Sequence, residues 1–235
     1  MSWRVGLLIP ASNTVMEVDC YRSLPHDATL HVGRMHTADL AESQEADEED
    51  LDRFVIPAAN ALAAVVPHIV VFDCGALTAL SAGECEHRLA DRIAESTGSA
   101  AIGVGAATLQ ALRDTHASRV AVVTPYGEDT NRRLAAVLEA NGVTVSAVHG
   151  MGLSSVERIG MTSDAVYAFV QSRIGPRVAG DALLIADTTI PAMGALSLLK
   201  ISYDVPIVTC NLAVLQSVKR ELEDLRQKDM ARLSS

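Results

Sequence analysis

Short apolar runs of four or five residues alternate along the chain with longer segments in which apolar residues recur every three or four positions. The clearest runs are Val5–Ile9, Ile69–Phe72, Val120–Val123 and Ala182–Ala186. Their valine, isoleucine and leucine content is typical of strands that are buried on both faces. The longer segments have the periodicity of amphipathic helices. Strands that alternate with helices in this way predict an α/β fold with parallel sheets covered on both faces.

Part of this pattern occurs twice. Arg4–Pro10 matches Arg119–Pro125 at an offset of 119 − 4 = 115 residues, and Ile69–Thr78 matches Ala182–Pro191. Strand-and-turn units that recur at nearly one spacing indicate a duplicated half-domain. We therefore expect two pseudo-symmetric, Rossmann-like halves with parallel sheets, and an active site in the cleft between them.

The repeat also predicts where the chain divides. We expect residues 1–113 together with about 211–235 to form the first α/β half, and residues 114–210 to form the second. A chain of 235 residues is long enough to bury a substantial core in this arrangement.

Cys74 stands just beyond the run Ile69–Phe72, at the edge where ligands bind in open parallel sheets. The turn after it leads into an expected helix, whose first N–H groups can bind an anion and lower the pKa of a nearby thiol. Cys74 is therefore a candidate nucleophile. The alternative is that Cys74 is a small buried residue that fills space behind the strand.

Asp187 occupies the position in the second half that corresponds to Cys74, since 187 − 74 = 113. Pseudo-two-fold packing would bring the two side chains to opposite sides of one cleft. The alternative is that Asp187 caps the helix that follows it or binds Thr189.

Composition excludes several classes of partner. The formal net charge is −10 and no basic cluster occurs, so we expect no binding to nucleic acid or to anionic membranes. No apolar run approaches the ~20 residues that span a bilayer, and the N-terminus lacks a signal-peptide pattern, so we expect a cytoplasmic protein. The cysteines and histidines show no metal-ligand spacing, and no metal site is expected.

With these residues in view, the chain resembles the aspartate/glutamate racemase superfamily, and within it the branch of maleate cis-trans isomerase and arylmalonate decarboxylase. The resemblance rests on Asn13 in the turn Pro10–Thr14, on Cys74, and on Thr124-Pro125-Tyr126 followed by Asn131. It covers nearly the whole chain. It implies two pseudo-symmetric α/β halves, catalysis without a cofactor, and a homo-oligomer, either a dimer or a tetramer.

The resemblance also implies roles for individual residues. Cys74 corresponds to the catalytic cysteine of the first half, Asn13 to a carboxylate-binding asparagine, and Tyr126 to a tyrosine that hydrogen-bonds a substrate carboxylate. The other expected substrate-binding residues are Gly75, Ala76 and Thr188. Asn13 has the alternative role of capping the first helix, and Tyr126 that of a turn residue at the rim.

Three positions depart from the family pattern. Asp187 stands where the second catalytic cysteine is expected, and Gly75-Ala76 replaces a Thr-Ser pair, so that only backbone donors remain there. The isomerase asparagine of the loop after the sixth strand is not evident in Leu153-Ser154-Ser155. A thiol and a carboxylate are chemically unequal, which favours a directional reaction over a symmetric racemisation.

Three functions are consistent with these residues and this resemblance. The first is an isomerase of the maleate isomerase or racemase type, in which Cys74 adds to or deprotonates a small carboxylate or dicarboxylate and Asp187 moves the other proton. The second is a decarboxylase, in which Cys74 alone protonates the enolate left after a malonate-type acid loses CO2. The third is a carboxylate-binding homologue in which the change at position 187 has abolished turnover.

Overall fold

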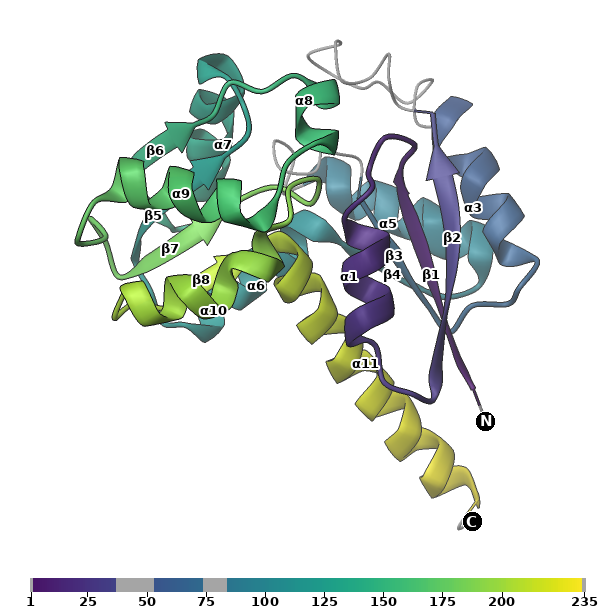
Figure 1. Cartoon of the computed structure of the whole chain (residues 1–235). Coiled ribbons are helices and arrows are strands. Elements are labelled where there is room, and N and C mark those ends of the chain that lie inside the picture. Colours follow the sequence, from purple (N-terminus) through teal and green to yellow (C-terminus); the bar gives the residue numbers. More distant parts are fainter. Residues whose placement is uncertain (1, 37–52, 74–83, 234–235) are drawn as a thin grey trace.

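The computed structural model describes residues 2–36, 53–73 and 84–233, which form two four-stranded sheets side by side (Figure 1). The first sheet has the order β2-β1-β3-β4 and the second has the order β6-β5-β7-β8. The strands of the first sheet are β1 (Trp3–Pro10), β2 (Ala28–Met35), β3 (Ile69–Phe72) and β4 (Ala100–Gly103). Those of the second are β5 (Arg119–Thr124), β6 (Thr144–Gly150), β7 (Ala182–Ile185) and β8 (Ile207–Thr209). Every neighbouring pair is parallel, as the apolar runs predict.

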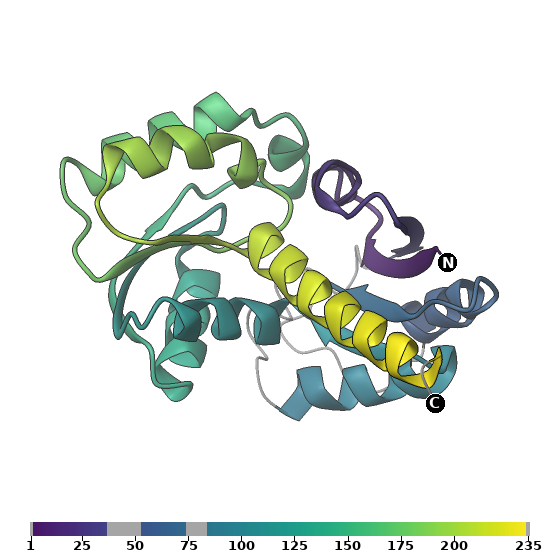
Figure 2. The same ribbon diagram turned by 90° about the horizontal axis from the view of Figure 1, so that it is seen from below.

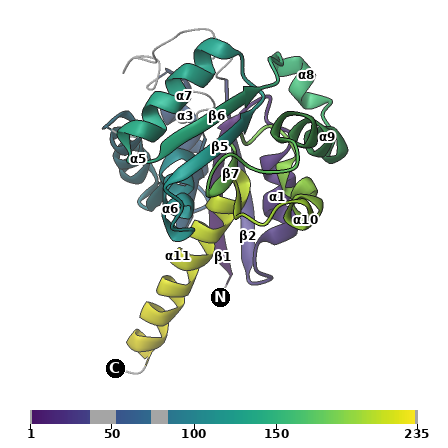
Figure 3. The same ribbon diagram turned by 90° about the vertical axis from the view of Figure 1, so that its left-hand side faces the viewer.

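The helices follow the strands in alternation. They are α1 (Met16–Ser23), α3 (Ile56–Ala63), α5 (Glu84–Thr97), α6 (Val104–Asp114), α7 (Glu128–Ala140), α8 (Ser155–Ile159), α9 (Ser163–Ile174), α10 (Ala192–Ser202) and α11 (Cys210–Leu233). Figure 3 shows the second sheet with α7 on one side and α9 and α10 on the other. No helix among the described residues has the length and apolar character needed to cross a bilayer.

The two sheets have the same order of equivalent strands, which is the pseudo-symmetry that the sequence repeat predicts. The equivalence extends to single hydrogen bonds beyond the strand ends. The Asp73 N–H donates to the Leu8 carbonyl at 2.9 Å, and the Ala186 N–H donates to the Val123 carbonyl at 2.9 Å. Asp73 and Ala186 are therefore equivalent positions, and the next residues in the chain are Cys74 and Asp187.

Alternate residues of the central strands enter different apolar clusters, because successive side chains of a strand point to opposite faces. One cluster joins the two sheets and contains Leu7 and Ile9 of β1 together with Val120 and Val122 of β5. Leu8 of β1 instead packs in a cluster on the outer face of the first sheet. The central strands are thus buried on both faces, as their sequence predicts.

Helices α6 and α11 connect the two sheets. α6 follows β4 but also packs against β8, and α11 follows β8 but also packs against β3 and β4. Figure 2 shows α11 running diagonally across the molecule, and Figure 1 shows its last turns extending away from both sheets. Because each of these helices contacts both sheets, the division at residues 113/114 and 210/211 stays a prediction.

Candidate active site

Asn13 is fully buried in the turn between β1 and α1. Its Oδ1 accepts hydrogen bonds from the N–H groups of Val15 at 3.1 Å and Met16 at 3.0 Å, where α1 begins. Its Nδ2 donates to Oγ1 of Thr188 in the second half at 2.9 Å. The hydrogen bonds of the alternative capping role are therefore present, and the amide also reaches the second half. Carboxylate binding by Asn13 stays a prediction.

Arg34 of β2 holds this turn in place. Its Nη1 donates to the carbonyl oxygens of Ala11 at 3.1 Å and Asn13 at 3.0 Å, and its Nη2 forms an ion pair with Glu17 at 2.5 Å. The backbone of Asn13 is thus fixed from outside while its side chain points inward. This preorganisation lowers the cost of orienting the amide toward the second half.

Asp73 accepts hydrogen bonds from both halves of the chain. Only 1% of its surface is exposed, and its carboxylate accepts hydrogen bonds from the Thr188 hydroxyl and from Asn13 Nδ2, the latter at 3.5 Å. Sequence analysis did not single out Asp73, although it directly precedes the candidate nucleophile. Cys74, Gly75 and Ala76 lie outside the described residues.

Asp187 is buried at the carboxyl end of β7. Its Oδ1 accepts hydrogen bonds from both the N–H and the hydroxyl of Thr189. Its Oδ2 lies 3.8 Å from Nη1 of Arg158, whose side chain is 20% exposed. The contact with Thr189, which the sequence left as an alternative role for Asp187, is present. It involves Oδ1, and Oδ2 faces Arg158.

Tyr126 is buried beside Asp187 and is not exposed at a rim. Its N–H donates to Thr124 Oγ1 at 3.1 Å, and its carbonyl accepts from Asn131 Nδ2 at 3.2 Å. The Arg158 guanidinium lies over the ring, 5.0 Å from its centroid. These contacts bring Tyr126, Asp187 and Arg158 together in one cluster.

The electrostatics of this cluster keep the tyrosine neutral. Burial first, and then the charge of Asp187 and a hydrogen bond to it, raise the pKa of the Tyr126 hydroxyl well above its usual value. A neutral phenol can donate a hydrogen bond to a carboxylate oxygen of a bound acid or stabilise negative charge that develops there.

Cys210 lies at the start of α11 and does not supply a second reactive thiol. Its side chain is buried, and burial raises the pKa of the thiol to about 12, with the charges of Asp187 and Asp73 acting in the same direction. A thiol with so high a pKa remains protonated near neutral pH and is a poor nucleophile. Within the described part of the chain, no group of three or more His, Cys, Asp or Glu side chains could hold a metal ion.

The structure therefore brings four of the predicted site residues together at the carboxyl ends of the central strands: Asn13, Tyr126, Asp187 and Thr188. Two further members, Asp73 and Arg158, were missed by sequence reasoning. Arg158 belongs to a glycine- and serine-rich segment between β6 and α9 whose length is typical of functional loops. A single basic residue there was the only available signal.

Comparisons with known proteins agree with this architecture. The sequence profile of the arylmalonate decarboxylase family matches residues 5–234. Maleate isomerase of Nocardia farcinica is 26% identical over 237 residues, which cover 94% of this chain and 90% of that protein. The predicted family and fold are thereby confirmed.

Two solved structures illustrate the range of the similarity. A variant of N. farcinica maleate cis-trans isomerase with a covalently bound succinylcysteine intermediate superposes with a TM-score of 0.78 at 22% identity, covering 95% of this chain and 94% of that one. Arylmalonate decarboxylase superposes with a TM-score of 0.71 at 21% identity, covering 92% and 91%.

Proposed function

Because the chain belongs to the arylmalonate decarboxylase family, we propose that it is a cofactor-independent isomerase of a small carboxylic or dicarboxylic acid that uses Cys74 for catalysis. The maleate isomerase relative and the succinylcysteine intermediate of the structural neighbour support this reaction class. The expected isomerase chemistry, with decarboxylation as the alternative, agrees with both.

One observation carries the proposal. Cys74 and Asp187 each follow a residue whose N–H continues the pairing of an equivalent strand, so the two positions correspond across the pseudo-symmetry. In open α/β sheets, side chains at this edge are the ones that meet the ligand. This correspondence supports a site to which one half contributes the Cys74 thiol and the other half the Asp187 carboxylate.

For an unsaturated acid, the thiolate of Cys74 adds to one carbon of the double bond and forms a C–S bond. The former double bond becomes a single bond, the negative charge moves onto the adjacent carboxylate as an enediolate, and rotation about the single bond becomes possible. Loss of the thiolate breaks the C–S bond and restores the double bond in the other geometry. The Tyr126 hydroxyl is a donor that can stabilise the enediolate.

In the proton-transfer version of the reaction, Cys74 removes a proton from the α-carbon and Asp187 returns one on the opposite face. The two groups differ in basicity, so the two proton-transfer steps have unequal rates. Arylmalonate decarboxylation is the second candidate, because the structural similarity to that enzyme is nearly as extensive and one proton donor is sufficient for it.

The proposal is tested with three assays on the purified full chain. Maleate is assayed for fumarate, a methylarylmalonate for release of CO2, and L- and D-aspartate separately for loss of optical rotation. We expect one assay to be positive and Cys74→Ala to abolish that activity. Cys20→Ala is the matched control, since Cys20 is a buried thiol in α1 whose pKa is raised to about 12. Full activity in Cys74→Ala would contradict every catalytic scheme, and no activity on any acid would favour the carboxylate-binding alternative.

The proposal retains two further expectations from the sequence. We expect the protein to be cytoplasmic and to assemble as a dimer or tetramer. Light scattering coupled to size-exclusion chromatography measures the assembly directly, and a monomeric mass would contradict it.

A further inference from the structure

We propose that Arg158 binds a carboxylate group of the substrate and that Asp187 holds the guanidinium in position to do so. This inference rests on the proposed function, because it concerns the same site. It assigns the recognition of an anionic substrate to a residue of the segment between β6 and α9.

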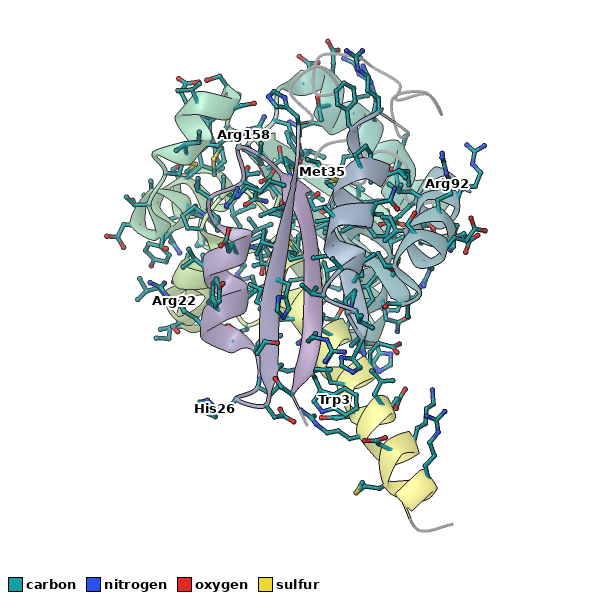
Figure 4. All side chains as sticks on the ribbon, turned by 90° about the vertical axis from the view of Figure 1, so that its right-hand side faces the viewer. Trp3, Arg22, His26, Met35, Arg92 and Arg158 are labelled. Carbon is teal, nitrogen blue, oxygen red and sulfur yellow. The ribbon has the colours of Figure 1, made fainter. Side chains whose placement is uncertain are left out.

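Arg158 is carried by α8, and a capping box fixes the start of this short helix. The Ser154 hydroxyl accepts from the Glu157 N–H at 3.3 Å, and Glu157 Oε2 accepts from the Ser154 N–H at 2.8 Å. The reciprocal bonds satisfy two N–H groups that the helix itself leaves unpaired. Figure 4 shows Arg158 extending from α8 toward the middle of the molecule, at the same end of the first sheet as Met35.

Three contacts orient the guanidinium. Its Nε and Nη2 donate to the Leu153 carbonyl at 3.3 and 3.2 Å. Its Cζ lies 5.0 Å from the centroid of the Tyr126 ring. Nη1 faces Asp187 Oδ2 at 3.8 Å, which is longer than an N–H···O hydrogen bond. The pair is therefore held by charge rather than by a short hydrogen bond, and Nη1 keeps the geometry to donate to an incoming carboxylate.

A small cavity lies against this group. It has a volume of about 20 Å³ and is lined by Ser12, Ser155, Arg158, Ile159 and Thr189. Its walls come from the turn that carries Asn13, from α8, and from the residue that binds Asp187. Arg158 therefore lines a space where the two halves of the chain meet.

The charges of the site favour a cation for binding an acid. Asp73 and Asp187 are both buried, with 1% and 6% of their surfaces exposed, and each would repel an anionic substrate. The repulsion is strong because charges interact more strongly in a partly buried site than in water. Arg158 is a cation placed against Asp187, one of these two carboxylates, and its planar guanidinium matches the geometry of a carboxylate group.

Binding of succinate, an acid without a double bond to react, tests the assignment by titration calorimetry. We expect Arg158→Gln to weaken binding about 10- to 100-fold, since hydrogen bonds between charged groups are worth that much. Arg158→Lys keeps the charge but loses the planar set of N–H donors, so we expect an intermediate affinity for succinate. Arg173→Gln is the matched control, because Arg173 also stacks on an aromatic ring, Phe169, at 5.6 Å but belongs to the exposed face of α9.

An unchanged affinity in Arg158→Gln overturns the proposal, and so does a failure of the wild-type protein to bind succinate at any attainable concentration. If Arg158→Gln unfolds, Arg158→Lys decides the question. Wild-type affinity of Arg158→Lys for succinate would count against binding of the carboxylate by two N–H groups of the guanidinium. The binding experiment does not depend on turnover. Weaker binding in Arg158→Gln without turnover of any acid would remove the proposed function alone, whereas loss of turnover in Cys74→Ala with unchanged binding in Arg158→Gln would remove this inference alone.

Where an acid is turned over, a kinetic readout separates substrate binding from a merely structural role. We expect KM to rise in Arg158→Gln by about the factor measured for succinate, with kcat changing much less. A variant that lowered kcat and thermal stability while KM stayed constant would show that Arg158 only supports the fold.

Discussion

The Nδ2 of Asn13 donates a hydrogen bond to the Oγ1 of Thr188 at 2.9 Å and so joins the first half of the chain to the second. The Thr188 hydroxyl in turn donates to Asp73 of the first half. All three side chains are buried. Because a partly satisfied buried network is costly, this short chain of hydrogen bonds holds the two sheets in register at Asp73, the residue that precedes the candidate nucleophile.

Replacing Thr188 by valine tests the importance of this link. The change keeps the shape but removes the hydroxyl, so Asp73 and Asn13 each lose a buried partner. We expect the free energy of unfolding to fall by about 1–3 kcal/mol, measured by urea denaturation. Thr144→Val, at an exposed position at the start of β6, is the control and should change stability little. Equal effects of the two changes would show that the inter-half link carries no particular stability.

Replacing Asp187 by asparagine tests its role in proton transfer. The asparagine Oδ1 can still accept from Thr189, so the local turn should persist, but the side chain can no longer take up a proton. We expect kcat to fall by about 10²- to 10⁴-fold on an acid that reacts by proton transfer at its α-carbon, the reaction in which Asp187 returns a proton. Asp181→Asn is the control, because Asp181 also accepts backbone N–H bonds, from Ser118 and Arg119, at an exposed site. Wild-type kcat in Asp187→Asn would exclude proton transfer by this carboxylate.

Glu86 of α5 predicts a pH-dependent stability. Its Oε1 accepts from the Gly105 N–H at 2.8 Å, and burial raises the pKa of its carboxyl from 4.5 to about 7. Between these pH values the folded state binds more protons than the unfolded state, so the stabilising contribution of the neutral acid is lost as the pH rises. The loss amounts to about 3 kcal/mol across this window, from 7 − 4.5 = 2.5 units.

Glu86→Gln removes this titration while keeping an acceptor for Gly105. Urea unfolding of both proteins at several pH values should show the wild type losing stability relative to the variant between pH 4.5 and about 7. Below pH 4.5 the difference should be constant. Parallel curves over the whole range would mean that Glu86 titrates normally.

Gly127, which follows Tyr126 in the chain, and Gly150, which lies against the Tyr126 carbonyl, make a matched pair. A Cβ on Gly150 would collide with Asn131 Nδ2 and with the Tyr126 carbonyl, which together fix the tyrosine turn, whereas a Cβ on Gly127 would meet nothing within 4 Å. We expect Gly150→Ala to destabilise the protein by about 1–3 kcal/mol and Gly127→Ala to be nearly neutral. Thermal melting measures both, and comparable melting temperatures would contradict the proposed rigidity of this turn.

The linear order of apolar residues determined the architecture. Short runs at Val5–Ile9, Ile69–Phe72, Val120–Val123 and Ala182–Ala186 predict doubly buried strands because a strand surrounded by helices needs apolar side chains on both faces. Their spacing predicts the two matching sheets that the structure shows. The same spacing identifies Cys74 and Asp187 as corresponding positions, since a residue number relative to a strand end is a local property.

Only the tertiary structure decided what surrounds those positions. Asp73 receives hydrogen bonds from Asn13 and from Thr188, which is 115 residues away along the chain, and Arg158 reaches Asp187 from a helix that follows a different strand. Such partners are selected by how the two sheets and the connecting helices pack, and no local pattern records that packing. The sequence alone therefore determined the strands and the candidate reactive positions. Folding determined the charges and hydrogen bonds around them, because those depend on contacts between distant parts of the chain.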